Sequence, residues 1–174
     1  MALTLYQKRK AIETLSQAFN DAKKLGININ QAVLTAQALH ESAWLTSKLA
    51  LQANNLFGIK ASSFWKGETI LMQGFEWNPK TRKMENQDIL WRKYSSFAPC
   101  IKNYSDIINL NPWYQDALPF VNGPSDQFLA NIIAEGPSKN WPKGEPGWAT
   151  DPDYAKKVKT VATEVQYLGG PKWV

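Results

Sequence analysis

Cysteine and histidine are nearly absent from this sequence. The chain of 174 residues has one cysteine, Cys100, and one histidine, His40. A single cysteine excludes an internal disulfide, and one residue of each kind excludes a zinc site built from cysteine and histidine. We therefore expect no metal ion and no cofactor, so that any chemistry must come from acidic, hydroxyl or aromatic side chains.

Long apolar stretches are missing as well. No window of the sequence approaches the roughly 20 apolar residues of a membrane-spanning helix. The first ten residues, MALTLYQKRK, become charged without the apolar stretch of a secretory signal peptide. We expect a protein without membrane insertion, made in the cytoplasm, that needs another system to deliver it if its target lies outside.

The composition and the charge suit one globular domain over residues 1–174, with 44% hydrophobic and 20% charged residues. The net charge of +5 favours a polyanionic partner, either nucleic acid or an anionic cell wall. The basic residues are dispersed rather than gathered in a long run, which disfavours nucleic acid. We expect a monomer that binds no nucleic acid.

Tryptophan is abundant, with eight residues, several of them beside Pro, Gly, Asn or Lys. Such surroundings are typical of loops, and a flat aromatic surface in a loop is suited to stacking on a sugar ring or a base. Packing of a loop against the core explains any single tryptophan equally well.

Helical and strand-like patterns follow one another in a simple order. Their periodicity predicts an α+β fold, mostly α-helical, with a small β-hairpin lobe at about residues 60–94 beside a cleft. The expected elements are a helix over 5–25 ended by Gly26, a helix capped by Asn30, strand-like runs around a turn at 78–83, helices near 96–110 and 111–120, a helix capped by Ser125 and ended by Gly136, an ordered loop over 136–152, and a last helix capped by Asp151 and ended by Gly169.

Glu41 lies near the end of the second predicted helix, on a face that is apolar apart from Gln37. A carboxyl group held there is partly desolvated, which raises its pKa into the range that a general acid needs. The alternative is an ordinary acidic residue at a helix end. His40 and Ser42 are a poor nucleophile pair, because they flank Glu41 and neighbouring helix positions point about 100° apart.

The segment around Glu41, AQALHESAWLTSKLALQANNLFGIKAS, resembles the signature of the peptidoglycan N-acetylglucosaminidases of glycoside hydrolase family 73. This family includes the muramidase-like domain of flagellar rod-cap proteins and many bacterial and phage lysins. Its pattern is roughly A-Q-A-x-x-E-S-G-W, a spacer and N-L-F-G-I-K, and Ala43 stands where the family has glycine. The resemblance continues through SFWKGETI, WRKYSSFAPCIKNYSDII, WYQDAL and GWATDPDYAKKV, and covers about residues 30–165.

The resemblance implies a lysozyme-like fold and cleavage of the β-1,4 bond after N-acetylglucosamine in peptidoglycan, and the leading hypothesis is an endo-β-N-acetylglucosaminidase. Glu41 matches the general acid of the family. A second carboxylate is expected in the hairpin lobe, at Glu76 or, as the reserve choice, Glu85. Trp148 stands where the family's Y-A-T-D motif has tyrosine, and it cannot perform a role that needs the tyrosine hydroxyl. Tyr154 either supplies a hydroxyl or packs in the core.

Several aromatic and amide side chains near these motifs are expected to contact the substrate. They are Trp44, Asn55, Phe57, Trp65, Trp141 and Trp148. Packing inside the domain is the alternative for each of them.

The chemistry leaves three routes open after Glu41 protonates the leaving oxygen. Glu76 acts as a base on water, or as a nucleophile, or the substrate's own 2-acetamido group attacks.

Two other activities share the fold, those of an N-acetylmuramidase and of a lytic transglycosylase, and a non-catalytic cell-wall-binding module is the alternative of another class. A phage lysin, released by a holin or carried on the virion, or a secreted effector, is the expected setting.

Overall fold

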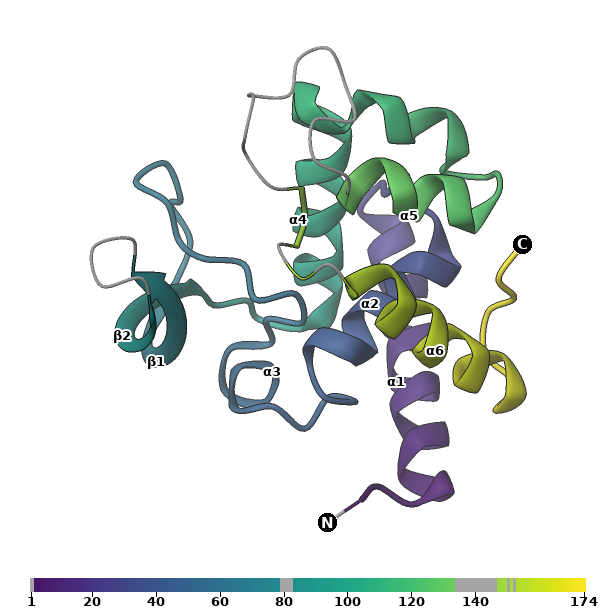
Figure 1. Ribbon diagram of the computed structural model, residues 1–174, viewed down its shortest axis with the longest axis horizontal. Coiled ribbons are helices and arrows are strands. Elements are labelled where there is room, and N and C mark those ends of the chain that lie inside the picture. The colour runs from purple at the N-terminus through teal and green to yellow at the C-terminus, as the bar shows by residue number, and fades with distance from the viewer. Residues whose placement is uncertain (1, 79–82, 134–146, 150, 152) are drawn as a thin grey trace.

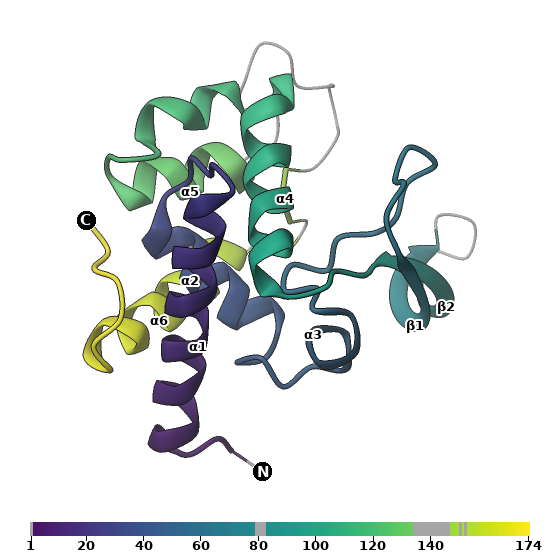
Figure 2. The ribbon, with the colours of Figure 1, turned by 180° about the vertical axis from the view of Figure 1, so that it is seen from behind.

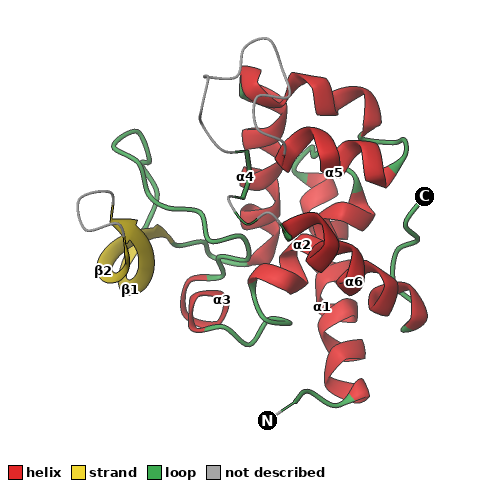
Figure 3. Ribbon diagram, viewed as in Figure 1, coloured by secondary structure: helices red, strands yellow, loops and turns green. Residues whose placement is uncertain are grey.

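The computed structural model of the chain describes residues 2–78, 83–133, 147–149, 151 and 153–174, and only the backbone of 75–78, 83 and 84 (Figure 1). Helices dominate, with one two-stranded sheet (Figure 3). The elements are α1 (Leu5–Lys24), α2 (Gln31–Glu41), α3 (Lys48–Ala53), β1 (Thr69–Asn78), β2 (Lys83–Arg92), α4 (Phe97–Leu110), the 3-10 helix η1 (Pro112–Phe120), α5 (Ser125–Ile133) and α6 (Tyr154–Tyr167).

Helix α2 forms the centre of the helical body. Its residues 32–39 are all buried, and α1, α5 and α6 pack against it (Figure 1). A helix that is apolar on every side is stable only when other elements surround it. The side chain of Asn30 caps α2 as predicted, by accepting a hydrogen bond from the backbone N–H of Val33 at 3.1 Å. The general acid candidate therefore ends a rigid central helix.

The predicted hairpin lobe is confirmed and stands to one side of the helices in both views (Figures 1 and 2). Strands β1 and β2 are antiparallel, from the pair Thr69 and Arg92 to the pair Asn78 and Lys83. Each strand runs over ten residues, longer than the short runs predicted from the sequence. Most of the turn predicted at 78–83 lies outside the described residues.

Arg92 ties the base of the lobe to the helical body. Its guanidinium group donates to Oδ1 of Asn103 in α4 at 2.7 Å and to the backbone oxygen of Lys60 at 3.1 Å. The same group lies over the ring of Trp65, 4.6 Å from its centroid. These contacts set the direction in which the lobe leaves the body.

Two predicted caps differ from the structure. Ser125 is the first residue of α5 instead of its cap, and its buried hydroxyl donates to Oδ1 of Asn30 at 3.3 Å. Helix α6 begins at Tyr154, later than predicted, although the carboxylate of Asp151 accepts a hydrogen bond from the N–H of Asp153 at 2.9 Å. The predicted end of α5 at Gly136, and most of the loop at 136–152, lie outside the described residues.

No helix in the described part of the chain has the length and apolar content to cross a membrane.

Candidate active site

A cleft of about 680 Å³ opens between the end of α2, the loop after α3, η1, and the start of α6. The hairpin contributes Trp91 to one wall. Ionisable, aromatic and aliphatic side chains share the lining. The lining residues are His40, Glu41, Phe57, Gly58, Ile59, Lys60, Trp91, Ile107, Tyr114, Gly147, Trp148, Ala149, Asp151 and Tyr154.

Glu41 is the last residue of α2 and reaches this cleft. Part of its side chain is open to solvent, but the surrounding protein desolvates the carboxyl group and raises its pKa above the ordinary value. A hydrogen bond from Tyr154 and the nearby His40 lower the pKa, without cancelling this effect. Glu41 is therefore more easily protonated than a free glutamate, in the direction that the sequence leads us to expect.

A chain of hydrogen bonds lies behind Glu41. The Tyr154 hydroxyl donates to Oε1 of Glu41 at 2.7 Å and accepts from Nε2 of Gln37 at 3.1 Å. The Tyr104 hydroxyl donates to Oε1 of Gln37. Gln37 and Tyr104 are fully buried, and burial raises the pKa values of Tyr104 and Tyr154 far above that of a free tyrosine. Both tyrosines therefore keep their protons.

The backbone after Glu41 takes an unusual course. Ala43, Trp44 and Leu45 all have positive φ angles, of 49°, 59° and 66°. Such a run is costly for residues other than glycine. The buried hydroxyl of Ser42 holds it in place, by donating to the carbonyl of Ala38 at 2.5 Å and accepting from the N–H of Leu45 at 2.9 Å. The Ser42 hydroxyl thus serves the turn that follows the helix.

Three aromatic rings build the wall next to Glu41. Phe57 stacks on Tyr104 with a centroid separation of 4.2 Å. Trp148 meets Tyr104 edge to face at 4.6 Å and Phe57 at 6.4 Å. Phe57 and Trp148, both predicted to contact the substrate, also line the cleft. Trp148 is half-buried and presents an aromatic ring of the kind on which sugar rings stack, whereas Phe57 is 4% exposed and packs behind it.

Two other aromatic residues predicted to contact the substrate, Trp44 and Trp65, are not among the residues that line this cleft. Trp44 lines a separate shallow pocket on α1, with the ammonium group of Lys8 4.8 Å from its ring centroid. Trp65 packs against Tyr94 at the base of the lobe, and its indole N–H donates to the backbone oxygen of Glu68. Each ring is thereby held in a packing role.

Asn55 is also not among the cleft-lining residues. It is 1% exposed, and its amide group bonds to the backbone N–H and C=O of Ile59 and to the C=O of Arg92. These bonds, of 2.9 to 3.0 Å, join the loop after α3 to the end of β2. The structure thus uses Asn55 to shape the loop.

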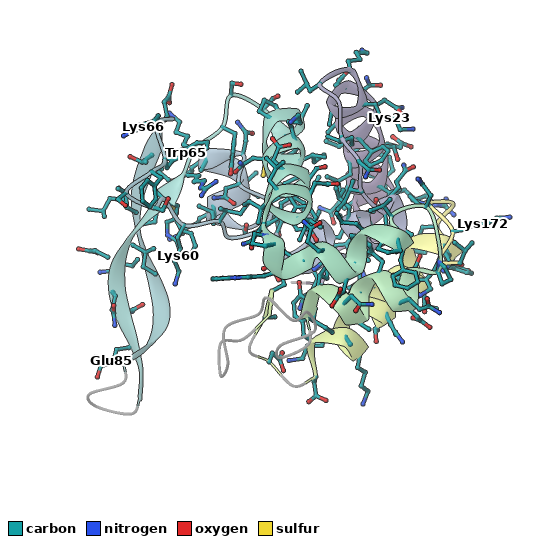
Figure 4. The ribbon with its side chains drawn as sticks, turned by 90° about the horizontal axis from the view of Figure 1, so that it is seen from above. Lys23, Lys60, Trp65, Lys66, Glu85 and Lys172 are labelled. Atoms are coloured by element: carbon teal, nitrogen blue, oxygen red, sulfur yellow. The ribbon has the colours of Figure 1, made fainter. Side chains whose placement is uncertain are left out.

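The predicted second carboxylates occupy the hairpin. Glu76 and Glu85 are directly paired across β1 and β2. Figure 4 shows Glu85 toward the far end of the hairpin, whereas Lys60 lies where the lobe approaches the helices. Glu85 is not among the described residues that line the cleft, and the side chain of Glu76 lies outside the described part of the structure. Trp141 also lies outside the described residues.

Some cleft residues carried no clear signal in the sequence. Tyr114, Trp91 and Lys60 reach the cleft from elements distant in the chain. Asp151 was predicted only as a cap, yet it lines the cleft, and its ion pair with Lys157 holds the pKa of its carboxyl group below the usual range. The two carboxyl groups of the cleft thus have pKa values shifted in opposite directions, upward for Glu41 and downward for Asp151. No group of three potential metal ligands occurs in the described part of the chain.

A mostly helical domain with a small two-stranded lobe beside an acidic cleft is the architecture of lysozyme-like domains. The profile of one family, described as mannosyl-glycoprotein endo-beta-N-acetylglucosaminidase, matches residues 16–167. The chain belongs to this glucosaminidase family of glycoside hydrolases. The family and the fold class predicted from the sequence are both confirmed.

Individual relatives agree with this assignment. The chain is 32% identical over 150 residues to the peptidoglycan hydrolase FlgJ of Vibrio parahaemolyticus, covering 84% of this chain and 44% of that protein. It is 31% identical over 132 residues to the exo-glucosaminidase LytG of Bacillus subtilis, covering 75% and 42%. The chain spans less than half the length of the curated relatives it matches.

The fold is shared with solved structures. The catalytic domain of the autolysin Auto from Listeria monocytogenes superposes with a TM-score of 0.71 at 23% identity, covering 97% of this chain and 89% of that one. The overlap extends over both the helical body and the hairpin.

Proposed function

We propose that this protein is a peptidoglycan hydrolase that cleaves the β-1,4 bond after N-acetylglucosamine, with Glu41 as the general acid. The observation that carries the proposal is the desolvated carboxyl group of Glu41 in the cleft, hydrogen-bonded by Tyr154. Membership of the glucosaminidase family supports the reaction type, and the names of FlgJ and LytG support the substrate.

Breaking a glycosidic bond requires a proton on the leaving oxygen and stabilisation of a positively charged sugar ring. Glu41 supplies the proton, because its raised pKa keeps a larger fraction protonated near neutral pH. Trp148, packed against the buried Phe57, holds the sugar against one wall. The ionised Asp151 adds negative charge to the cleft, which favours a cationic transition state.

The second catalytic group remains part of the proposal. Glu76 is our first choice as base or orienting group, with attack by the substrate's 2-acetamido group as the other route. Family membership and the place of Glu76 in the hairpin support this choice. Tyr154 cannot replace the missing family tyrosine without releasing Glu41, because its single proton is already donated there.

The first experiment is a digest of purified peptidoglycan, reduced with borohydride and analysed for new reducing ends. Wild-type protein should produce reduced N-acetylglucosamine, and Glu41→Gln should lose at least ~100-fold of the rate, as expected for removal of a general acid. Glu13→Gln, a surface change on α1, is the matched control and should keep full activity.

Other products would favour other activities. Reduced muramic acid would indicate an N-acetylmuramidase, and anhydro-muramic acid a lytic transglycosylase; either result would keep Glu41 as the acid but change the bond. Absence of new ends in every sample would favour a cell-wall-binding module. Product length separates endo from exo action, since an endo enzyme releases long fragments first.

Two matched variants test the second group. Glu76→Gln should reduce the rate strongly if Glu76 is the base, whereas Glu85→Gln, its partner across the strands, should not. Equal activity of both variants and the wild type would favour the acetamido route. The α-anomer as first product would indicate inversion, and the β-anomer retention.

We further propose that the protein acts at the cell wall as a phage lysin, with family membership as the support. Co-expression of the wild-type protein with a holin should cause lysis of the host culture. Co-expression of the Glu41→Gln variant with the same holin should not.

A further inference from the structure

The donors in the hydrogen-bond chain from Tyr104 to Glu41 all point in one direction. A tyrosine hydroxyl carries one proton, and the amide of glutamine has separate donor and acceptor atoms. Because Gln37 donates to the hydroxyl oxygen of Tyr154, the proton of Tyr154 is directed at Oε1 of Glu41. The chain joins α4, α2 and α6.

The opposite direction would leave a buried proton without an acceptor. A reversed Gln37 amide would donate to Tyr104, and the hydroxyl proton of Tyr104 would then need another partner. Within the described part of the chain, Gln37 is the one hydrogen-bond partner of this hydroxyl, and Tyr104 is 0% exposed. An unpaired buried donor is strongly disfavoured, so the burial of Tyr104 fixes the orientation of the amide.

We propose that Gln37 is a positioning residue that, by fixing this direction, confines the acidic proton of Glu41 to Oε2. Oε1 accepts from Tyr154, and because a carbonyl oxygen is a better acceptor than a protonated one, this bond favours the proton on Oε2. Among the residues that the structure describes, none donates to Oε2, so this oxygen is left to meet a substrate atom in the cleft. The inference rests on the proposed role of Glu41 as general acid.

Other ionisable groups approach Glu41 from each neighbouring element, and all of them except Tyr104 stay unchanged in the test below. They are His40 on α2, Tyr154 and Asp151 at the start of α6, Lys60 in the loop after α3, Tyr104 on α4 and Tyr114 in η1.

The decisive variant is Gln37→Met with Tyr104→Phe. This variant removes both partners of the hydrogen bond from the Tyr104 hydroxyl to Oε1 of Gln37. Neither the donor nor the acceptor of that bond is left buried and unpaired, so the variant should fold. Without the Gln37 donor, the hydroxyl of Tyr154 is less polarised, so its hydrogen bond to Oε1 of Glu41 weakens. The carboxylate of Glu41 thereby loses part of its stabilisation. The pKa of Glu41 should therefore rise, and kcat at the optimum should fall by about tenfold with KM unchanged.

The readout is a carbon-13 NMR titration of the Glu41 carboxyl signal, assigned by its loss in Glu41→Gln. Ser105→Ala is the control, since it removes a buried hydrogen bond from α4 one position away from the chain. Its Glu41 pKa and kcat should match the wild type. If the double variant does not fold, Tyr104→Phe alone frees the amide to reverse and should raise the Glu41 pKa by a smaller amount.

An unchanged Glu41 pKa in the folded variant would overturn the proposal and leave Gln37 as a packing residue. The titration needs no substrate, so its result does not depend on whether the proposed hydrolytic function is correct. Full hydrolytic activity of Glu41→Gln would reject the general acid, whereas the NMR result alone decides whether Gln37 controls the proton.

Discussion

The hydroxyl of Tyr154 donates a 2.7 Å hydrogen bond to Oε1 of Glu41, joining residues 113 positions apart. Tyr154 is 4% exposed, so the residue both packs in the core and reaches the candidate acid. The core packing expected as one alternative therefore does not remove the Tyr154 hydroxyl from the cleft. Helices α2 and α6 pack along each other, which fixes the distance between the two groups.

Replacing Tyr154 with phenylalanine should move the alkaline limb of the pH–rate profile to higher pH. The hydrogen bond stabilises the carboxylate and lowers the pKa of Glu41. Its removal raises that pKa, and a general acid loses activity as the pH rises through its pKa. The kcat plateau should fall about tenfold, because the carboxyl group loses its orientation. The measurement is kcat from pH 4 to 9 on peptidoglycan fragments.

Tyr167→Phe is the control, since it changes an exposed tyrosine on the same helix. A downward shift of the alkaline limb in Tyr154→Phe would contradict the direction of the hydrogen bond.

Glu41→Gln should gain thermal stability over the wild type as the pH rises. Desolvation raises the pKa of Glu41 in the folded state above its unfolded value. The contribution of such a group is fully present below the unfolded pKa, ~4.3, and is lost as the pH rises through the folded pKa. The difference in Tm between variant and wild type should therefore be larger at pH 8 than at pH 4. A difference independent of pH would argue against a raised pKa.

Ala43→Gly should stabilise the protein by about 0.5–1 kcal/mol. Ala43 has a φ angle of 49°, which disfavours a residue with a Cβ atom. Glycine relieves this strain, and its greater freedom in the unfolded chain offsets part of the gain. Ala43→Val at the same position should destabilise instead, since a β-branched side chain fits this region worst. Chemical denaturation of the three proteins measures both effects, and a lower stability of the glycine variant would contradict the strain.

Asn55→Ala should cost about 3 kcal/mol of unfolding free energy. The change leaves backbone groups of Ile59 and Arg92 without their partners in a buried region. Gln52→Ala, an exposed change in α3, should have little effect. At temperatures where Asn55→Ala remains folded its KM should be close to that of the wild type; a large rise in KM without loss of stability would restore the predicted contact with substrate.

The regular elements could be predicted because their signals are local. The apolar stripe of α1 and the Asn30 cap of α2 are spacings within a few residues, and both match the structure. The Ser125 cap failed because Asn30, 95 positions away, takes up its hydroxyl. Local propensity therefore gave the right element and the wrong partner.

The candidate site was predicted in part. Glu41, Phe57 and Trp148 lie on one cleft, as expected. Trp44, Trp65 and Asn55 come from the same motifs, but the structure turns them to packing and loop-shaping contacts. An aromatic or amide residue in a loop has the same local pattern whether it lines a cleft or supports it.

The sequence by itself determined the family and the order of helices and hairpin, because those depend on motifs and periodicity along the chain, and it supplied Glu41 as the candidate acid. Tertiary structure alone decided which groups control that acid. Gln37 and Tyr154 lie 117 positions apart, and only the packing of α6 on α2 brings them within hydrogen-bonding distance. A buried polar group must find its partner wherever the fold places one, and no local pattern records that choice.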